Sequence, residues 1–243
     1  MKFQIFSDLH ITDNNILPNI SPTADYLILA GDIGKITDKK YISFFNFVDS
    51  KWKLTFYILG NHEFYSKKYT MKEMLNFYKK FFKKYKNIKL LYNDTYDFGE
   101  YLIVGTTLWT YPNIKDFTRP LLSNTKKGRI WNLKKYLKFS DKCKEFLKNI
   151  KTKKKVILIT HFPVISKYTF NENNQYEDNL TWLTNNYDIT KFKFYKQLST
   201  IISGHTHFSY DFNYKKVRFI SNQYGYLSQG NQLCKLNGMF KIT

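Results

Sequence analysis

Five short polar clusters, rich in aspartate, asparagine and histidine, are spaced along this 243-residue chain. In chain order they are Asp8-Leu9-His10, Gly31-Asp32, Gly60-Asn61-His62-Glu63, His161-Phe162-Pro163 and Gly204-His205-Thr206-His207. All five histidines of the chain lie within these clusters. Aspartate, asparagine and histidine bind borderline and hard divalent cations, and no cysteine accompanies them. The residue types therefore predict a metal site, provided that the clusters meet in space.

Each cluster taken alone has an ordinary structural interpretation. An aspartate such as Asp8 or Asp32 at the end of a strand commonly caps a turn or a helix. A single histidine such as His161 is more often structural than catalytic. The Gly-His-x-His element is harder to dismiss, because a chain with 10 glycines and five histidines contains it by chance with a probability of about 0.004. Its occurrence beside four further clusters favours a metal centre over five unrelated turns.

Short apolar, β-branched runs precede the clusters and predict buried strands. These runs are Lys2–Phe6, Tyr26–Ala30, Thr55–Leu59, Tyr101–Val104, Val156–Thr160 and Thr200–Ser203. Helices are predicted between them at Asp38–Ser50, Lys67–Tyr85, Leu133–Ile150 and Asn179–Asn186, and antiparallel hairpins from Ser209 to Thr243. Strands that alternate with helices before a β-rich tail predict a layered α/β sandwich. Ligands bind at the carboxyl ends of the strands in such sheets, so we expect the clusters to converge there.

Composition limits the class of protein. A hydrophobic fraction of 43% argues against disorder, and the length suits one domain spanning residues 1–243. The chain contains no apolar run long enough to span a membrane. In its first eight residues the apolar stretch is too short, and polar residues follow it too early, for a signal peptide to be expected. Cys143 and Cys234 lie far apart, in no metal or redox spacing. Together these features predict a cytoplasmic protein.

The formal charge of +20 suggests attraction of anionic partners such as nucleic acids. However, arginine occurs at only three positions, Arg119, Arg129 and Arg218, and the other basic residues are lysine. Arginine suits bidentate phosphate contacts, whereas lysine is a diffuse, strongly solvated charge. We therefore interpret the lysines as mostly solvated surface, which still attracts an anionic substrate.

In their order and spacing, the five clusters resemble the motifs of the calcineurin-like metallophosphoesterase superfamily over residues 8–207. The resemblance implies a four-layer α-β-β-α sandwich, in which two facing mixed β-sheets are flanked by helices and two divalent metal ions bind at the strand ends. Asp116-Phe117 and Ser221-Asn222-x-x-Gly225-Tyr226 are similar to features of single-domain bacterial and viral members.

The resemblance also implies the role of each site residue. It divides the metal ligands into two sets, Asp8, His10 and His207 for the first ion and Asn61, His161 and His205 for the second. Asp32 would bridge both ions, because its charge offsets the repulsion between cations about 3.5–4 Å apart. His62 would protonate the leaving oxygen, and Glu63 would hold a ligand or His62 in orientation. Mn²⁺ is the expected metal, and Fe, Zn or Ni would also suit these donors.

The implied activity is phosphate-ester hydrolysis, in which a metal-bridging hydroxide attacks phosphorus in line. Protein Ser/Thr phosphatases have the pattern Gly-Asp-x-x-Asp-Arg-Gly at the second motif. This chain lacks the arginine there, which argues against a phosphoprotein substrate. We expect substrate-facing insertions near 109–133 and 163–182. Their aromatic residues, together with Arg119, either stack a base and hold a phosphate or merely pack the loops. The aromatic residues in question are Tyr111, Phe117, Trp131, Tyr168, Tyr176 and Trp182.

The leading hypothesis is a phosphodiesterase that acts on a nucleotide-like or nucleic-acid substrate, with Asn61 and Arg119 among its contacts. One alternative is a phosphomonoesterase. A binding scaffold of the same fold that has lost catalysis is the other, although such scaffolds typically lack one or more of the histidines and this chain lacks none. No membrane association is expected, and the sequence indicates no obligate protein partner.

Overall fold

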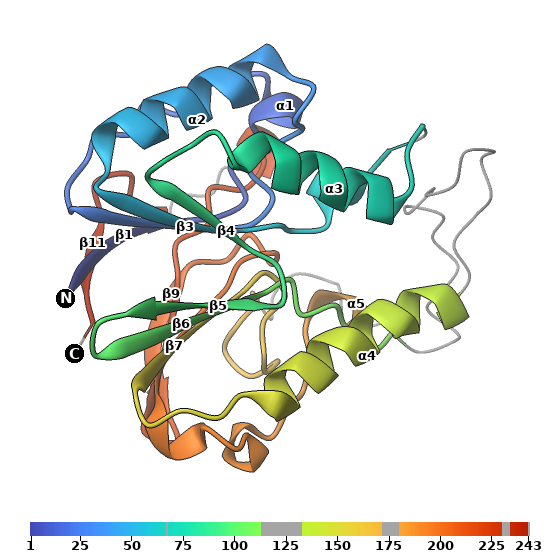
Figure 1. Ribbon diagram of the computed structural model, residues 1–243, viewed down its shortest axis with the longest axis vertical. Coiled ribbons are helices and arrows are strands. Elements are labelled where there is room, and N and C mark those ends of the chain that lie inside the picture. The colour runs from blue at the N-terminus through green and yellow to red at the C-terminus, as the bar shows by residue number, and fades with distance from the viewer. Residues whose placement is uncertain (67, 113–132, 172–179, 230–233, 243) are drawn as a thin grey trace.

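The computed structural model describes residues 1–66, 68–112, 133–171, 180–229 and 234–242. Two β-sheets face each other, and helices cover the outer face of each (Figure 1). The strand order is β11-β1-β2-β3-β4 in the first sheet and β5-β6-β7-β8-β10-β9 in the second. This arrangement is the four-layer α-β-β-α sandwich with mixed sheets that the sequence predicts.

Parallel pairing dominates the centre of each sheet, and the edge strands β11, β5 and β9 are antiparallel to their neighbours, whereas the edge strand β4 is parallel to β3. The first sheet contains β1 (Lys2–Phe6), β2 (Tyr26–Ala30), β3 (Leu54–Ile58), β4 (Ile88–Leu91) and β11 (Met239–Lys241). The second contains β5 (Asp94–Phe98), β6 (Tyr101–Thr106), β7 (Lys155–Thr160), β8 (Leu198–Ile202), β9 (Tyr210–Tyr214) and β10 (Val217–Ser221). Because the central strands are parallel, their carboxyl ends lie together at one edge of each sheet.

Successive side chains along the strands point to alternate faces of the sheets and so form two hydrophobic layers. In β2, Ile28 and Ala30 face the opposite sheet, while Leu27 and Leu29 face the covering helices. The layer between the sheets is rich in isoleucine, and its members from the second sheet include Ile157 of β7. Successive side chains of a strand point to opposite faces, so strands buried on both sides must be apolar throughout. This packing fixes the positions of the strand ends.

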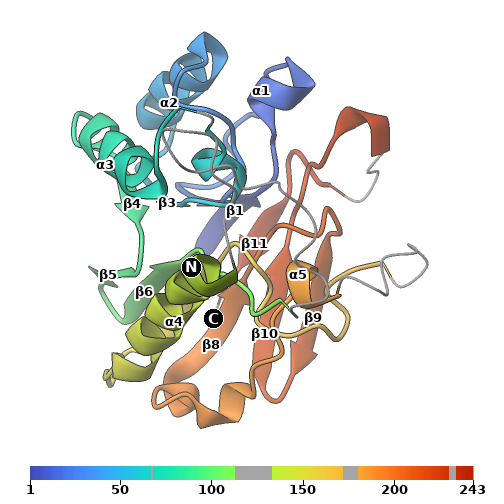
Figure 2. The ribbon, with the colours of Figure 1, turned by 90° about the vertical axis from the view of Figure 1, so that its right-hand side faces the viewer.

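The longer helices are α2 (Lys39–Lys51), α3 (Met71–Phe82) and α4 (Leu133–Asn149), and the short ones are α1 (Ile11–Asn14) and α5 (Leu180–Leu183). Short 3₁₀ helices are η1 (His62–Phe64), η4 (Ile189–Lys191), η5 (Tyr195–Gln197) and η6 (Leu227–Gln229). Helices α2 and α3 cover the first sheet, and α4 covers the second (Figures 1 and 2). The Asp38 side chain caps α2, and Thr70 and Glu73 form a capping box at the start of α3.

The predicted elements agree with the structure at β1, β2, α2 and α4 to within one residue. The helix predicted from residue 67 begins only at Met71, because the capping box ends the non-helical segment at Thr70. The predicted helix at 179–186 is wrong in length, since α5 has only four residues. Strands β4 and β5 were not predicted from the sequence. In β5, polar residues alternate at a partly exposed sheet edge. The tail forms the predicted hairpin β9–β10, but β11 pairs with β1.

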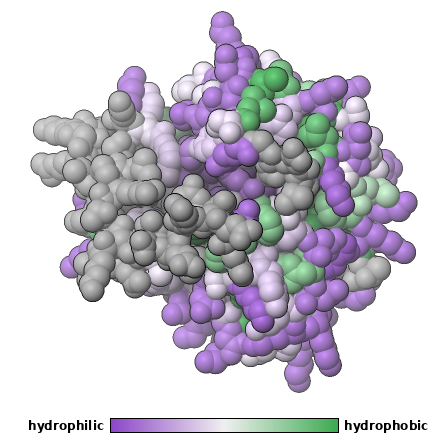
Figure 3. All heavy atoms as spheres, turned by 180° about the vertical axis from the view of Figure 1, so that it is seen from behind, coloured by the Kyte–Doolittle hydropathy of each residue, from purple (hydrophilic) through white to green (hydrophobic). Residues whose placement is uncertain are grey.

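Polar residues cover most of the described surface on the face shown in Figure 3, and hydrophobic residues form small separate patches there. This is the pattern expected for a lysine-rich, solvated surface. Among the described helices, none combines the length and the apolar character needed to cross a bilayer. Much of the two predicted insertions, residues 113–132 and 172–179, lies outside the described residues.

Candidate metal centre

The five polar clusters meet at the carboxyl ends of the strands. Asp8 and His10 follow β1, Asp32 follows β2, Asn61 follows β3, His161 follows β7, and His205 and His207 follow β8. Their side chains supply three groups of possible metal donors, in each of which the donor atoms lie within 4.8 Å of one another. The groups are Asp8–His10–His207, His10–Asp32–His62 and Asp32–His161–His205. Loops separated by up to about two hundred residues of sequence thus form one site.

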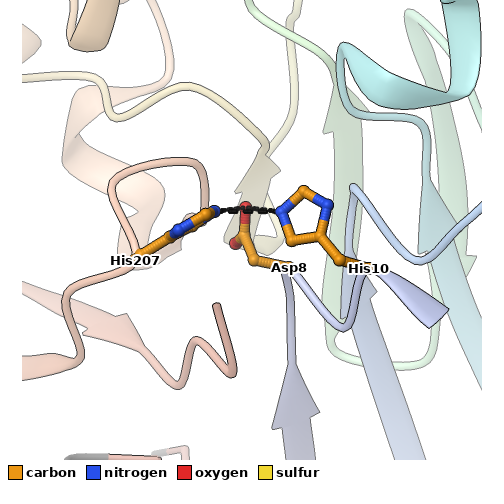
Figure 4. Close-up of side chains that lie close together, drawn as sticks. All are labelled: Asp8, His10 and His207. Carbon is orange, nitrogen blue, oxygen red and sulfur yellow. Dashed lines mark hydrogen bonds and ion pairs between the residues drawn. The ribbon is translucent and has the colours of Figure 1, made fainter. Parts of the chain in front are cut away.

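The first group joins the ends of β1 and β8. The Nε2 atoms of His10 and His207 lie 3.0 Å apart. Asp8 Oδ1 lies 3.6 Å from His207 Nε2 and 4.0 Å from His10 Nε2. Figure 4 shows the two imidazoles pointing toward each other with the carboxylate between them. Two nitrogens and one oxygen therefore converge on one small volume.

The third group, Asp32–His161–His205, joins the ends of β2, β7 and β8, and Asn61 at the end of β3 lies beside it. His161 Nε2 lies 3.4 Å from Asp32 Oδ2 and 2.8 Å from Asn61 Oδ1. His161 Nδ1 lies 2.9 Å from the Ala30 carbonyl oxygen, which can accept only from a protonated Nδ1. That contact leaves the Nε2 lone pair of a neutral imidazole directed into the site. The Asn61 amide nitrogen donates to the Tyr65 hydroxyl at 2.7 Å, which turns Oδ1 toward His161.

Asp32 lies between the two groups. It shares one donor group with His10 and another with His161 and His205. Its Oδ1 accepts from the backbone amide of His62 at 2.8 Å, and its Oδ2 faces the His161 ring. Asp32 is therefore the residue whose carboxylate can contact two ions at once.

The backbone is strained at the residues that converge. Asp8, His10, Asp32, His205 and His207 all adopt positive φ values, between 44° and 74°. A non-glycine residue in this region costs roughly 1–3 kcal/mol and persists only where the surroundings enforce it. Backbone hydrogen bonds between the loops supply that constraint, from Asp8 N to Gly31 O (2.9 Å) and from His10 N to Asp32 O (3.0 Å). Strain concentrated at these residues is typical of a functional site.

Two glycines of the motifs allow the loops to approach closely. A Cβ atom on Gly60 would lie 2.2 Å from Asp32 Oδ1, and one on Gly31 would lie 2.5 Å from His161 Nδ1. Gly31 also has φ +91°, which side chains rarely tolerate. These glycines are therefore required by the packing of the site, beyond the turns that they form.

Glu63 connects the loops that follow β2 and β3. It is fully buried and accepts hydrogen bonds from the backbone amides of Asp32 (3.0 Å), Ile33 (2.7 Å) and Gly60 (2.7 Å), and from the Tyr57 hydroxyl (3.0 Å). Burial, together with the nearby Asp32 carboxylate, raises the pKa of Glu63 to about 7. The structure thus places Glu63 against the backbone of the loops that carry Asp32 and Asn61.

The electrostatics of the site differ between its histidines. Burial lowers the pKa of His205 well below its usual range, with a further contribution from the charge of His161. Burial also lowers the pKa of His207. Burial opposes ionisation of His161 too, but the Asp32 carboxylate outweighs it and raises the pKa to about 9. His205 and His207 are therefore neutral near pH 7, the form in which imidazole binds metals.

His62 contacts the predicted ligand Asp32 and two residues for which the sequence predicts no role, Asp13 and Tyr226. Its Nδ1 lies 3.2 Å from Asp13 Oδ2, and its Nε2 lies 3.3 Å from the Tyr226 hydroxyl and 4.0 Å from Asp32 Oδ2. Hydrogen bonds from His10 and His62 hold the pKa of Asp13 below its usual range. Asp13 was overlooked because an aspartate in the first turn of a helix ordinarily interacts with the helix terminus.

Other contacts fix His207. Its backbone amide donates to Gln223 Oε1 at 2.6 Å, and its Nδ1 contacts Gln229 Oε1. A donating Nδ1 directs the Nε2 lone pair toward Asp8 and His10. No polar pattern in the tail signalled these glutamines. Arg119, the remaining predicted site residue, lies outside the described residues.

The donor set fits two divalent metal ions. It combines buried carboxylates with imidazoles that converge, and the backbone and neighbouring side chains orient several of the rings before any ion binds. Two of the three donor groups share the Asp32 carboxylate, which matches the requirement of a dinuclear site for a charged bridge. His62 shares a donor group with His10 and Asp32.

Comparison with known proteins agrees with this geometry. The sequence profile of the calcineurin-like phosphoesterases matches residues 1–209. The uncharacterised protein L509 of Acanthamoeba polyphaga mimivirus is 25% identical, and the match covers 85% of this chain and 80% of that protein. The crystal structure of phosphopantetheinyl hydrolase from Mycobacterium tuberculosis has a TM-score of 0.68 at 16% identity, covering 94% of this chain and 90% of that one. At such low identity, the likeness concerns the fold.

Proposed function

Because the chain belongs to the calcineurin-like phosphoesterase family, whose members hydrolyse phosphate esters with metal ions, we propose that it is a phosphodiesterase acting on nucleotide-like or nucleic-acid substrates. The observation that carries the assignment of the site is the junction of two donor groups at Asp32, with His62 beside it. The enzyme is accordingly a phosphoric ester hydrolase, and the choice of diesters is the proposal.

We infer the metal ligands from the two groups. Asp8, His10 and His207 hold one ion, Asn61, His161 and His205 hold the other, and Asp32 contacts both. Two bound divalent ions, Mn²⁺ by our proposal, would supply a water made acidic enough to lose its proton near neutral pH. The neutral Asn61 amide adds no negative charge, which favours the approach of an anionic phosphate.

His62 provides the proton for the leaving oxygen. Asp13 accepts from Nδ1 and so stabilises the protonated ring, while Nε2 faces the site beside Asp32. Although burial opposes it, the charges of Asp32 and Asp13 raise the pKa of His62 and so favour the protonated ring. The side chain retains 21% exposure, so a substrate oxygen can reach it.

The charge balance favours a diester over a monoester. Within the described part of the chain, the ion pairs of Asp8 and Asp32 involve imidazoles only, without lysine or arginine. A monoester dianion would need a further cation for its second charge, whereas a diester carries a single charge. We take this charge balance as support for a diester substrate.

Support for a nucleotide-like substrate comes from Tyr168. It is 51% exposed and follows the loop after β7, where Thr169 O accepts from Thr206 Oγ1 of the Gly-His-Thr-His motif. The other described aromatic residues of the insertions are engaged elsewhere: Trp182 packs on Tyr136, and the Tyr111 hydroxyl donates to Asp141. The Tyr168 ring packs edge-on against Phe212, with ring centroids 5.5 Å apart, and because half of the residue is exposed we expect it to stack on a base.

The test is a substrate panel with the Mn²⁺-loaded protein. Bis(p-nitrophenyl) phosphate has a good leaving group, a dinucleotide has a poor one, and p-nitrophenyl phosphate is a monoester. We expect both diesters to be hydrolysed faster than the monoester. Hydrolysis of the monoester alone would overturn the proposal in favour of a phosphomonoesterase.

The variant His62→Ala tests the acid role. It should lose about 100-fold or more in kcat on the dinucleotide, and much less on bis(p-nitrophenyl) phosphate, because only the poor leaving group needs a proton. Its manganese content should equal that of the unmodified protein. Loss of one ion per chain would instead make His62 a metal ligand.

A further inference from the structure

Tyr226 is the unassigned residue that the structure brings closest to the proposed chemistry. It lies beyond residue 209, where the match to the family profile ends. Its ring stacks on His10, with ring centroids 4.3 Å apart and planes inclined by 26°, and packs edge-on against His207 at 4.9 Å. Its hydroxyl lies 3.3 Å from His62 Nε2. Tyr226 thus contacts both imidazoles of the first donor group and the proposed acid.

The segment that carries Tyr226 is built into the site by its backbone. The amide of Tyr224 donates to Ser7 O (3.0 Å), and the amide of Gly225 donates to Asp8 O (2.9 Å). The Asn14 side chain bonds on both sides of Tyr226, donating to Gly225 O (3.0 Å) and accepting from the Leu227 amide (3.1 Å). These contacts fix the phenol relative to the strand end that carries Asp8.

The position of the hydroxyl suits contact with substrate. In the resting site Nδ1 of His62 is directed at Asp13, and Nε2 lies 3.3 Å from the Tyr226 hydroxyl, whose oxygen accepts from a protonated Nε2 and keeps its own proton for a further partner. A substrate oxygen that takes the Nε2 proton must approach this same nitrogen, and it therefore comes within reach of the phenol. A neutral phenol adds a donor there without adding charge. Tyr226 is only partly buried.

We propose that Tyr226 is a catalytic residue that contacts the substrate, and that its hydroxyl donates a hydrogen bond to a phosphoryl oxygen beside His62. This assignment rests on the proposed phosphodiesterase site and adds a neutral donor to it. Such a donor stabilises the negative charge that increases on the phosphoryl oxygens during attack. It also explains why an aromatic ring that stacks on His10 carries a hydroxyl where a phenylalanine would pack equally well.

The test compares Tyr226→Phe with Tyr224→Phe. The first variant keeps the ring that stacks on His10 and removes only the hydroxyl. The second removes a hydroxyl from the same segment, on a ring that packs against the hydrophobic core. For each Mn²⁺-loaded protein, calorimetry measures the binding of inorganic phosphate, elemental analysis measures manganese, and kinetics on the dinucleotide give kcat/KM.

We expect Tyr226→Phe to bind inorganic phosphate about 10-fold more weakly and to lose a similar factor in kcat/KM, since one hydrogen bond to a charged group is removed. Its manganese content should be unchanged, and Tyr224→Phe should match the unmodified protein. Unchanged phosphate binding in Tyr226→Phe would overturn the assignment. A loss of manganese would also overturn it, because the phenol would then act through His10.

The two proposals fail in different ways. If the unmodified protein binds phosphate through Tyr226 but hydrolyses neither diesters nor the monoester, the contact stands and the proposed function is wrong. If diesters are hydrolysed with the leaving-group dependence of His62 and Tyr226→Phe behaves like the unmodified protein, the function stands and the Tyr226 contact is wrong.

Discussion

At the scale of single residues, the site is a set of imidazoles whose orientation other side chains determine. His161 is oriented by the Ala30 carbonyl, His207 by Gln229 and His62 by Asp13. Each of these contacts fixes which ring nitrogen faces the centre. The ligands themselves could be predicted from the sequence, because histidine is rare in this chain and occurs only in the motifs. Their partners could not be predicted, because glutamine and aspartate are ordinary surface residues whose proximity depends on the fold.

Asp13→Asn tests this dependence on a neighbouring residue. The amide cannot stabilise a protonated His62 as a carboxylate does, so we expect kcat on the dinucleotide to fall about 10-fold to 100-fold. Hydrolysis of bis(p-nitrophenyl) phosphate should change little, since its leaving group needs no proton. In a His62→Ala background the same substitution should have no further effect on the dinucleotide. An equal loss with both substrates would mean that Asp13 acts through His10 instead.

At the scale of elements, the strands place the residues and the glycines permit the contact. The buried strands β1 and β2 were predicted with their bounds because apolar runs of this length have few alternatives. β5 was not predicted because Asp94 and Asp97 interrupt its apolar pattern. Its pairing with β6 also depends on a hairpin for which the sequence has no clear turn signal. The left-handed conformations of Asp8 and Asp32 could not be predicted either, because the packing of the assembled loops imposes them.

Gly60→Ala tests the close approach of the loops. Because an added methyl group would lie 2.2 Å from Asp32 Oδ1, the loop after β3 must move away from the loop after β2. We expect weaker manganese binding and a lower free energy of unfolding, by about 1–3 kcal/mol, as for other overpacked positions. Gly99→Ala is the matched control, since its Cβ would meet nothing within 4 Å although its φ of +65° disfavours a side chain. If both variants bind manganese equally well, the approach at Gly60 is not what shapes the site.

At the scale of the whole molecule, two sheets and their helices hold five loops in register around one centre. The charge of +20 is carried mostly by lysines, and the described surface is polar over most of the face in Figure 3. Such a surface raises the local concentration of anionic substrates without specifying one. The family and the α/β sandwich could be predicted from the sequence because the five motifs occur in a fixed order, whereas substrate choice depends on loops that the motifs do not describe.

Metal binding should couple to global stability, because the ions bind a site that exists only in the folded chain. Saturating Mn²⁺ at about 100 times its dissociation constant stabilises the folded state by about 2.7 kcal/mol per site. For a chain of this size we expect the Tm to rise by roughly 5 °C or more, and a chelator to reverse the change. Thermal melts with and without EDTA measure it, and identical Tm values would argue against ions bound at the site.

The central claim is that one aspartate joins two metal sites, and anomalous diffraction from crystals of the Mn²⁺-loaded protein tests it most directly. We predict two anomalous peaks, one beside Asp8, His10 and His207 and one beside Asn61, His161 and His205, with the Asp32 carboxylate in contact with both. In Asp32→Asn crystals at least one of these peaks should weaken or disappear, because the negative charge between the cations is lost. A single peak, or two peaks of which Asp32 contacts only one, would contradict the account.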